Sequence, residues 1–544
     1  MNLRGTILAV LALLSAVAMA SGGSAHYTLS AATLDGGGSA GVSVHYSNGG
    51  HILSPAGIGA SAHYGNTVGF QFAAGLTVSL LSGGDVPGLP GATIVGSNEV
   101  PGPFAGDAVL TKIKLLSGAT VSALVRPSGV LVKVGDTLAS AGNAAISKLY
   151  AMSGGAFLAE LKLGTGSPVA TLTNNRLVCF APNAGIEVVA RSGDVAPGGF
   201  TTFKRFSACT GDATGDVFIG ATLNDQTTVD TGVWVRPVGG ALKILVKEGQ
   251  NVDLGSGLKR VNILAAFAFA SKSQAEGRVL YGDHSIITRL TIGTEHGIVV
   301  IPAAANSSAE WTVVARTGGD APGGIGKFST LGLPAAEDTN VAFKALLQPS
   351  PSVSAANNAI VVAGGTVIAR KGNLAPGTGN LFFSFADPAA GAPGQASFVA
   401  RLAGVSAASD EGLWEMRDSA LGLVARESDP APGLSPLKIR SIIRNAHPPG
   451  GLGPVFMATL NGVPVSTFLV LYGVPATGGP AVDLARTGDQ FDVGGMMRTL
   501  TLIKALKMDN GSQGVARGYD NTSLFMIGSF GVRNSALIAL PVTP

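Results

Sequence analysis

Val188–Gly198 reads VVARSGDVAPG, and this string decides the fold because close copies of it return along the chain. In each copy a short apolar run enters a turn rich in glycine, aspartate and proline, the residue types that β-turns require. The clearest further copies are Val313–Gly323, Val367–Gly377 and Leu423–Gly433. The string therefore indicates a tandem repeat of strands joined by tight turns.

Weaker copies extend the repeat over most of the chain, at Val78–Gly88, Leu131–Gly142, Leu245–Gly255 and Val482–Gly494. Successive copies lie 51 to 70 residues apart, which is a typical length for one propeller blade. The aligned turn positions are Asp85, Asp136, Asp194, Gln250, Asp320, Asn373, Asp429 and Asp489.

Each repeat holds enough apolar segments for about four strands, the content of one blade. A strand opened by glycine lies midway between turns, as in Gly394–Leu402, and a short apolar strand such as Gly412–Trp414 follows it. The sequence therefore predicts an all-β chain forming a β-propeller, with eight blades favoured. Degenerate repeats near Asp136 and in 500–544 leave seven blades open, and an open solenoid is the alternative architecture.

The order of the repeats predicts that the ring closes. The repeats begin with a turn at Asp85 and end with strands, 513–539, that no turn follows. The N-terminal segment is therefore expected to complete the C-terminal blade, which removes two exposed sheet edges.

The composition excludes several classes of protein. Glycine accounts for 78 of 544 residues and charged residues for only 13%, while the hydrophobic fraction is 46%. Charge-driven disorder needs the opposite balance, and collagen needs a three-residue glycine period that is absent. The formal charge of +3 and the lack of basic clusters argue against a nucleic-acid partner.

The first 20 residues have the pattern of a signal peptide. Arg4 supplies a positive charge, Thr6–Val17 is apolar, and Ala18–Ala20 gives the small-x-small cleavage pattern. A short membrane anchor is the alternative, and no later stretch is long and apolar enough to be a transmembrane segment. We expect a secreted or cell-surface protein with three parts: 1–20, a repeat module at 21–74 and the propeller at 75–544.

The module at 21–74 has a repeat of its own, in which His-Tyr pairs recur every 18 or 19 residues between glycine-rich stretches. Four of the seven histidines lie here: His26, His45, His51 and His63. Histidines at a regular period could bind zinc or copper, but the acidic or cysteine ligands that usually complete such a site are absent. Surface-facing positions on short strands are the favoured interpretation, so no metal or other cofactor is predicted.

The recurring turn aspartates admit a structural and a functional interpretation. A ring of carboxylates could bind calcium, yet each turn offers only one carboxylate, and Gln250 and Asn373 replace it in two turns. Aspartate followed by proline and glycine is ordinary turn chemistry, which we favour. The repeated arginine, for example Arg191, is expected to pair with a turn carboxylate or with carbonyls of the next blade.

The two cysteines, Cys179 and Cys209, are 30 residues apart. In an oxidising compartment they could form one disulfide, and otherwise they would be two buried free thiols. The spacing leaves both outcomes open.

The strings at Val188–Gly198 and Val313–Gly323 resemble exported bacterial repeat proteins that have A-R-x-G-D-x-A-P-G turns and N-x-x-G-x-x-A-F strands. The strand half of that signature is degraded here, because Thr339 and Ser397 stand where glycine and alanine are expected. The resemblance covers about residues 24–544. It implies an exported, propeller-like protein and carries no known activity.

No catalytic signature stands out in the sequence. No nucleophile elbow, phosphate loop or zinc-protease helix occurs, and His284 beside Asp283 has no companion serine motif. The favoured function is therefore a non-catalytic binding or structural module, with a glycan or a surface protein as its partner. The alternative is a polysaccharide hydrolase or lyase whose carboxylates converge in the propeller mouth, and a third interpretation is a purely structural envelope component.

Overall fold

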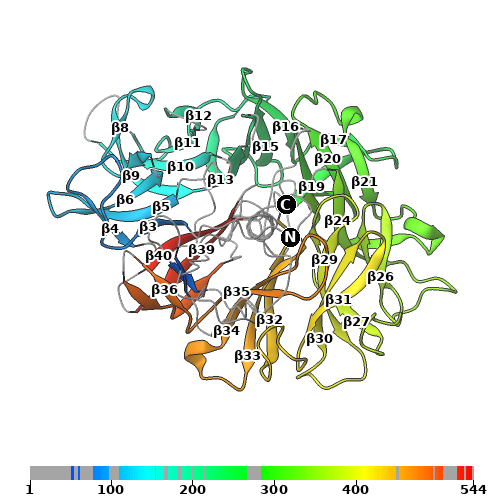
Figure 1. The fold of residues 1–544 in the computed structure, drawn as a ribbon. Helices are drawn as coiled ribbons and strands as arrows, with labels where there is room; N and C mark the ends of the chain where they lie inside the picture. Colours follow the sequence, from blue (N-terminus) through cyan, green and yellow to red (C-terminus); the bar gives the residue numbers. More distant parts are fainter. Residues whose placement is uncertain are drawn as a thin grey trace, which may run out of the picture.

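The computed structural model describes residues 51–53, 59–61, 77–96, 109–126, 128–152, 155–164, 170–181, 185–198, 201–211, 215–265, 284–337, 339–448, 453–493, 496–505, 523–531 and 535–541. Over these residues the chain is all-β, and its sheets are arranged as eight blades around a centre (Figure 1). The predicted eight-bladed propeller is confirmed. The only helices among the described residues are 3-10 turns: η2 (Ala139–Ala141), η3 (Ser308–Glu310), η4 (Pro322–Gly324) and η5 (Val465–Thr467).

Each blade contains four main antiparallel strands, which we number first to fourth in chain order. Blades 1 to 4 consist of β4 (Thr93–Gly96), β5 (Val109–Lys114), β6 (Thr120–Arg126), β7 (Gly129–Lys133); β9 (Ala144–Ala151), β10 (Ala156–Leu161), β11 (Arg176–Phe180), β12 (Glu187–Arg191); β13 (Phe203–Gly211), β14 (Val217–Leu223), β15 (Thr231–Arg236), β16 (Lys243–Lys247); and β18 (Leu258–Ala265), β19 (Ser285–Ile292), β20 (Glu295–Pro302), β21 (Thr312–Arg316).

Blades 5 to 8 continue the same pattern. They consist of β22 (Phe328–Leu331), β24 (Asn340–Leu347), β25 (Ala359–Ala363), β26 (Thr366–Arg370); β27 (Phe382–Phe385), β29 (Ala396–Leu402), β30 (Glu411–Arg417), β31 (Ala420–Arg426); β32 (Lys438–Ala446), β33 (Val455–Asn461), β34 (Leu469–Gly473), β35 (Val482–Arg486); and β38 (Leu502–Lys504), β39 (Ser523–Ser529), β40 (Ser535–Pro541), β3 (Thr77–Leu81).

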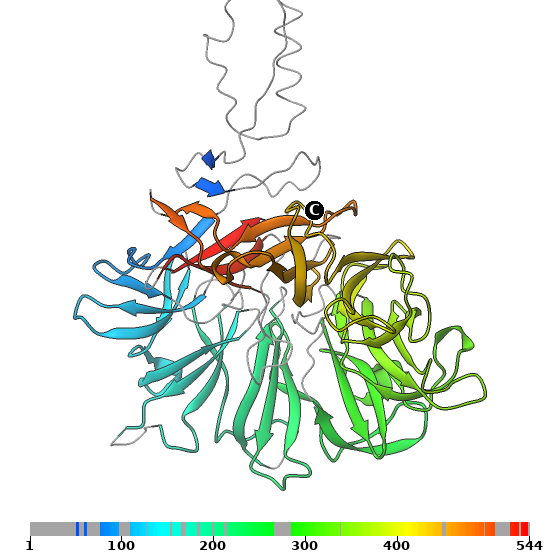
Figure 2. The same ribbon diagram turned by 90° about the horizontal axis from the view of Figure 1, so that it is seen from below.

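Short additional strands pair beside these blades. They are β8 (Thr137–Leu138), β17 (Asn251–Asp253), β23 (Ala335–Glu337), β28 (Ala389–Ala390) and the hairpin β36 (Gln490–Asp492) with β37 (Met497–Thr499). In the N-terminal region, β1 (His51–Leu53) and β2 (Gly59–Ser61) form a hairpin that lies near β36 (Figure 2). The rest of the expected module and the expected signal peptide lie outside the described residues, so the domain boundaries stay predictions.

The ring closes as the order of repeats predicted. Strand β3 pairs antiparallel with β40, so that a segment from the start of the chain supplies the fourth strand of the last blade. The register joins Thr77 to Ala539 and Leu81 to Ala536. This pairing removes the free sheet edge that an open ring would expose.

Each turn of the repeat is held to the next first strand by the same two backbone hydrogen bonds, which we call the turn bracket. In the best copy the Gly193 N–H donates to the Phe203 carbonyl at 2.8 Å, and the Phe203 N–H donates to the Asp194 carbonyl at 2.9 Å. The bracket forms in all eight repeats, at Gly83–Ile94, Gly135–Ile146, Gly193–Phe203, Gly249–Val261, Gly318–Phe328, Gly372–Phe382, Ser428–Ile439 and Gly488–Leu500. The second member of every pair is an apolar side chain buried to at least 96%.

The first member of each pair needs a left-handed backbone. Its φ is positive in all eight repeats, which is the conformation that the third residue of a type II turn adopts. Glycine has this conformation at little cost and occupies seven of the eight positions; Ser428, with φ +68°, is the exception. The glycine of the repeated Gly-Asp string is therefore explained by backbone geometry.

The arginine and the residue after it anchor the fourth strand to the loop between the second and third strands. Arg191 Nε donates to the Asn174 carbonyl at 2.8 Å, while Ser192 Oγ accepts the Arg176 N–H at 3.0 Å. Equivalent arginine bonds run from Arg370 to Asn357 and from Arg426 to Ser409. The carbonyls belong to the arginine's own blade, so the expectation of a bond to the next blade was wrong for these three residues. Arg486 instead meets a turn carboxylate, that of Asp489, at 3.6 Å.

The proline-glycine end of the turn packs under an aromatic residue of the third strand. Trp234 Nε1 donates to the Pro197 carbonyl at 3.0 Å, and Trp414 Nε1 donates to the Pro376 carbonyl at 3.1 Å. Glycine precedes each tryptophan by two residues because a Cβ there would lie 2.6 to 2.7 Å from the indole ring. These contacts explain the Gly-x-Trp strands in the sequence.

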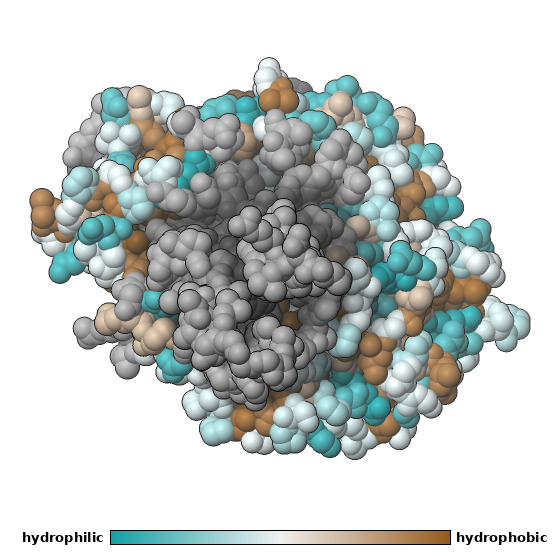
Figure 3. All heavy atoms as spheres, viewed as in Figure 1, coloured by the Kyte–Doolittle hydropathy of each residue, from teal (hydrophilic) through white to brown (hydrophobic). Residues whose placement is uncertain are grey.

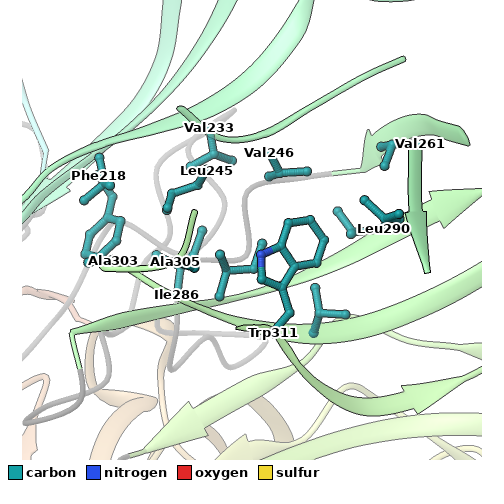
Figure 4. Close-up of a cluster of buried hydrophobic side chains, with 14 of the residues drawn as sticks. Phe218, Val233, Leu245, Val246, Val261, Ile286, Leu290, Ala303, Ala305 and Trp311 are labelled. Atoms are coloured by element: carbon teal, nitrogen blue, oxygen red, sulfur yellow. The ribbon is translucent and has the colours of Figure 1, made fainter. Parts of the chain in front are cut away.

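The hydrophobic core is divided among the seams between neighbouring blades. Eight clusters of buried side chains occur in the described chain, one at each seam. At the seam between blades 3 and 4, for example, Phe218 and Val233 face Ile286 and Trp311 (Figure 4). A single sheet cannot bury its apolar face alone, so each blade depends on both neighbours.

The turn bracket leads to a stability prediction. Replacing Gly193 by alanine should lower the free energy of unfolding by about 1–2 kcal/mol, because an L-residue at φ +85° is strained. The added Cβ would also lie 3.1 Å from the Asn174 side chain. Thermal unfolding measures the effect against the matched control Gly422→Ala, where φ is not positive and the new Cβ meets nothing within 4 Å. Equal melting temperatures for the two variants would contradict the importance of the bracket.

Candidate functional site

The two ends of the ring differ in how far the blades depart from the repeat. Because the strands are antiparallel, the connections from first to second and from third to fourth strand share one end, which we call the variable end. The first-to-second connection there has five residues in blade 3 (212–216) and nineteen in blade 4 (266–284). The opposite end, which we call the turn end, carries the eight turn brackets. Departures from a repeat are where function is sought, because the repeated parts are explained by folding.

One aspartate–histidine pair joins blades 3 and 4 at the variable end. Asp216 directly precedes β14 and His284 directly precedes β19, and His284 Nδ1 lies 2.9 Å from Asp216 Oδ2. The Asp216 side chain is 3% exposed, whereas that of His284 is 43% exposed. Asp216 Oδ1 also accepts the Val238 N–H at 2.7 Å. The carboxylate is thus fixed below the surface, while much of the imidazole reaches solvent.

Buried amide side chains join blades 5, 6 and 7 at the same end. Asn340 Nδ2 donates to the carbonyls of Gly391, Ala392 and Gln395, all in the neighbouring blade. In the next seam Asn445 Nδ2 donates to Ser397 Oγ at 3.0 Å. These bonds satisfy buried polar atoms and hold the connections between blades in place.

Arginines at the ends of third strands form further links between blades. Arg126 Nη2 donates to the Ala181 carbonyl at 2.8 Å, and Arg236 Nη1 lies 3.0 Å from Glu187 Oε2. Arg417 bonds to the Ala476 carbonyl and pairs with Glu415 at 2.6 Å. Burial raises the pKa of the Glu415 carboxyl, and the charge of Arg417 partly offsets this. The three arginines act as cross-links and are engaged by neighbouring backbone or carboxylate groups.

A buried acid lies beside the last bracket. Asp483 on β35 pairs in register with Tyr472 on β34. Burial raises the pKa of Asp483 to about 7, the nearby charge of Asp489 raises it further, and Arg486 lowers it. Burial also raises the pKa of the Tyr472 hydroxyl, which donates to the Pro432 carbonyl at 3.3 Å.

The structure places the aligned turn residues in, or one residue beyond, the turns of the brackets. The side chains of Asp136, Gln250 and Asp489 each accept the backbone N–H of the residue three positions earlier. Asp320 is exposed and pairs with Lys327 at 2.8 Å. Within the described part of the chain no three histidine, cysteine or acidic side chains group so as to hold a metal ion. The eight turn residues are distributed around the ring, one to a repeat.

The two cysteines lie in neighbouring blades, Cys179 on β11 and Cys209 on β13, and both are free and fully buried. Burial raises the pKa of the Cys179 thiol to about 12. Burial and the neighbouring Cys179 also raise the pKa of Cys209. Thiols with such pKa values have little thiolate character and are poor nucleophiles.

Of the histidines in the N-terminal repeat, His51 begins β1 and the others lie outside the described residues. The sequence analysis missed Asp216, because it noted His284 only beside Asp283. The available signal was positional, since Asp216 and His284 occupy the same place, immediately before the second strand, in successive repeats.

The face seen in Figure 1 has described residues around its rim in which hydrophilic and hydrophobic side chains alternate (Figure 3). No continuous apolar patch occurs on the described part of that face. None of the described helices is long and apolar enough to cross a membrane.

Comparison with protein families gives one match. A model described as a family of unknown function, DUF7453, matches residues 141–282 and 291–522. The chain belongs to the DUF7453 family. The matched residues run from blade 2 into blade 8, so the repeat itself is what defines this DUF7453 protein. No curated protein matches the chain.

Solved structures similar to this DUF7453 chain are distant. The β-propeller domain of the trilobed protease from Pyrococcus furiosus is 6% identical with a TM-score of 0.35, covering 73% of this chain and 98% of that chain. An ulvan lyase is 9% identical with a TM-score of 0.28, covering 86% and 96%. An oligogalacturonate lyase from Vibrio parahaemolyticus is 11% identical with a TM-score of 0.29, covering 82% and 93%. These likenesses assign no activity to the chain.

The buried Asp483 leads to a prediction about pH. Its pKa of about 7 lies above its value in the unfolded chain, so the folded state holds a proton that the unfolded state releases. The stability contributed by this proton is complete below about pH 4 and is lost as the pH rises through about 7. Asp483→Asn should therefore flatten the pH dependence and raise the melting temperature at pH 8 by about 2–4 °C.

The control for this measurement is Asp320→Asn, because that side chain is 81% exposed. It should leave the slope of melting temperature between pH 5 and 7 unchanged. If Asp483→Asn shows the wild-type slope as well, the carboxyl does not hold a proton in the folded state.

Proposed function

We propose that this chain is an exported, non-catalytic binding module whose ligand contacts the variable end of the propeller. One observation carries the proposal: the turn end repeats the same bracket eight times, while the connections at the variable end differ from blade to blade. Propellers and other scaffolds place binding residues on variable loops held by a rigid framework. The partner class is a glycan or a protein of the cell surface.

Export rests on the N-terminal pattern of Arg4, the apolar run Thr6–Val17 and the small residues Ala18–Ala20. Cleavage after Ala20 would release a chain that begins at Ser21. The protein would then be secreted or displayed at the cell surface.

The described polar groups support binding over catalysis. The inter-blade arginines and amides already bond to backbone or carboxylate partners, and the cysteines are buried. The polysaccharide hydrolase or lyase is the second candidate, and a single observation favours it, the Asp216–His284 pair at the variable end. A general base held by a buried carboxylate is a recurring catalytic arrangement.

The experiment that separates the two candidates uses residues 21–544, the form that signal cleavage would leave. Binding to an array of neutral and acidic glycans is measured beside the release of reducing ends and of unsaturated sugars from the same glycans. We expect binding without release. Release of either product would overturn the non-catalytic proposal, and an array without any bound glycan would exclude the glycan class and point to a protein partner.

A further inference from the structure

The position immediately before the second strand breaks the repeat in only two of the described blades. Gly155, Thr339, Gln395 and Pro454 occupy it in blades 2, 5, 6 and 7, and none of these side chains carries a charge. Blades 3 and 4 instead have Asp216 and His284, and these two groups face each other across a seam at 2.9 Å. Two titratable groups placed in contact by equivalent positions of adjacent repeats are not needed for the repeat to fold.

The contacts of Asp216 fix the proton on the imidazole. A carboxylate only accepts hydrogen bonds, so the His284 nitrogen facing Asp216 Oδ2 must donate, and Nδ1 carries the proton. In a neutral imidazole the other nitrogen, Nε2, is then the acceptor. The Val238 N–H holds Asp216 Oδ1 at 2.7 Å, so the carboxylate cannot turn away.

The exposure of the two side chains shows which part of the pair can meet a ligand. Asp216 is buried beneath the surface, and the ring of His284 is 43% exposed. Because Nδ1 faces the buried carboxylate, the ring edge that carries Nε2 lies on the opposite side, away from Asp216. The buried group therefore positions the ring, and the ring is the part that can contact a ligand.

The backbone of His284 is strained in a way that the fold alone does not require. Its φ is +51°, a left-handed value that costs a non-glycine residue about 1–2 kcal/mol. The His284 carbonyl accepts the Ala303 N–H at 2.6 Å, which holds this conformation in place. His284 is also the last residue of the nineteen-residue connection 266–284.

The charge around the pair selects the class of ligand. Asp216 is a fixed negative group, and an Nε2 lone pair repels an anionic oxygen. The described lysine at this seam, Lys243, is already bonded to the Ala304 and Ala305 carbonyls and to Asn306. A neutral donor group such as a hydroxyl suits this environment better than a carboxylate or sulfate.

We propose that His284 Nε2 contacts the ligand of this protein as a hydrogen-bond acceptor for a hydroxyl group of a neutral, hydroxyl-rich molecule such as an uncharged glycan. Asp216 is a positioning residue that acts through His284 by fixing its tautomer. This proposal rests on the proposed binding function and names the residue and the ligand chemistry at its variable end.

Asp216→Asn provides a test that a structural role would not reproduce. The Val238 N–H keeps the amide oxygen of Asn on its own side, so the amide NH2 faces His284 Nδ1. Nδ1 must then accept, and Nε2 becomes the donor. Nitrogen chemical shifts of the imidazole should show the proton on Nδ1 in the wild-type protein and on Nε2 in the variant. A wild-type proton on Nε2 overturns the proposal whatever the binding data show.

Binding is measured on cellulose, xylan and mannan oligosaccharides, with oligogalacturonate and alginate as anionic probes. Asp216→Asn and His284→Phe should each weaken binding of the neutral probe about tenfold, the effect of losing one hydrogen bond of about 1.4 kcal/mol. His284→Gln, which returns an acceptor oxygen, should bind more tightly than His284→Phe. The matched control is His296→Phe, at the start of β20 on the turn end of the same blade, which should bind like the wild type.

The outcomes distinguish the two proposals. If the wild-type protein binds none of the probes, the glycan form of the proposed function and this inference both fail. If it binds but all the variants match His296→Phe, the binding function stands and the role of His284 is overturned. Binding of only the anionic probes overturns the ligand class.

Discussion

The structure depends on a pair of backbone hydrogen bonds that recurs at every blade junction. The residue at the third position of the turn donates to a buried apolar residue near the start of the next first strand, and that residue donates back to the turn. In the copy at Gly193 the partner, Phe203, is 1% exposed. A turn that is bonded to a core residue sets where the next blade begins, so one short string determines the phase of a whole repeat.

The consequences follow around the ring. Each bracket brings the proline-glycine part of the turn under an aromatic residue of its blade, as with Pro197 and Trp234. Each blade then faces its neighbours across a cluster of buried side chains, one cluster to a seam. Because the stabilising contacts are local and repeated, the connections at the variable end are released from a structural role and are available for recognition.

The division between repeated and irregular parts also explains what could be predicted from the sequence. The spacing of the turn strings was sufficient to predict eight blades and the closure by Thr77–Leu81, because both follow from counting strands and turns. The aligned aspartates marked the right turns, but the glycine before them has the geometric constraint, as the exception at Ser428 shows. The arginine contacts were assigned to the wrong blade, because spacing alone does not say across which strand a side chain reaches. Asp216 and His284 are 68 residues apart, and nothing local in either segment indicates that they meet.

Hydrogen–deuterium exchange at the eight bracket amides tests the central claim most directly. The donors in the first strands are Ile94, Ile146, Phe203, Val261, Phe328, Phe382, Ile439 and Leu500. If the bracket holds every junction, these amides exchange as slowly as the amides of the central strands in all eight blades, including the junction that follows β3. Fast exchange at these amides beside well-protected central strands would contradict the account, since the blades would then be stable without the bracket.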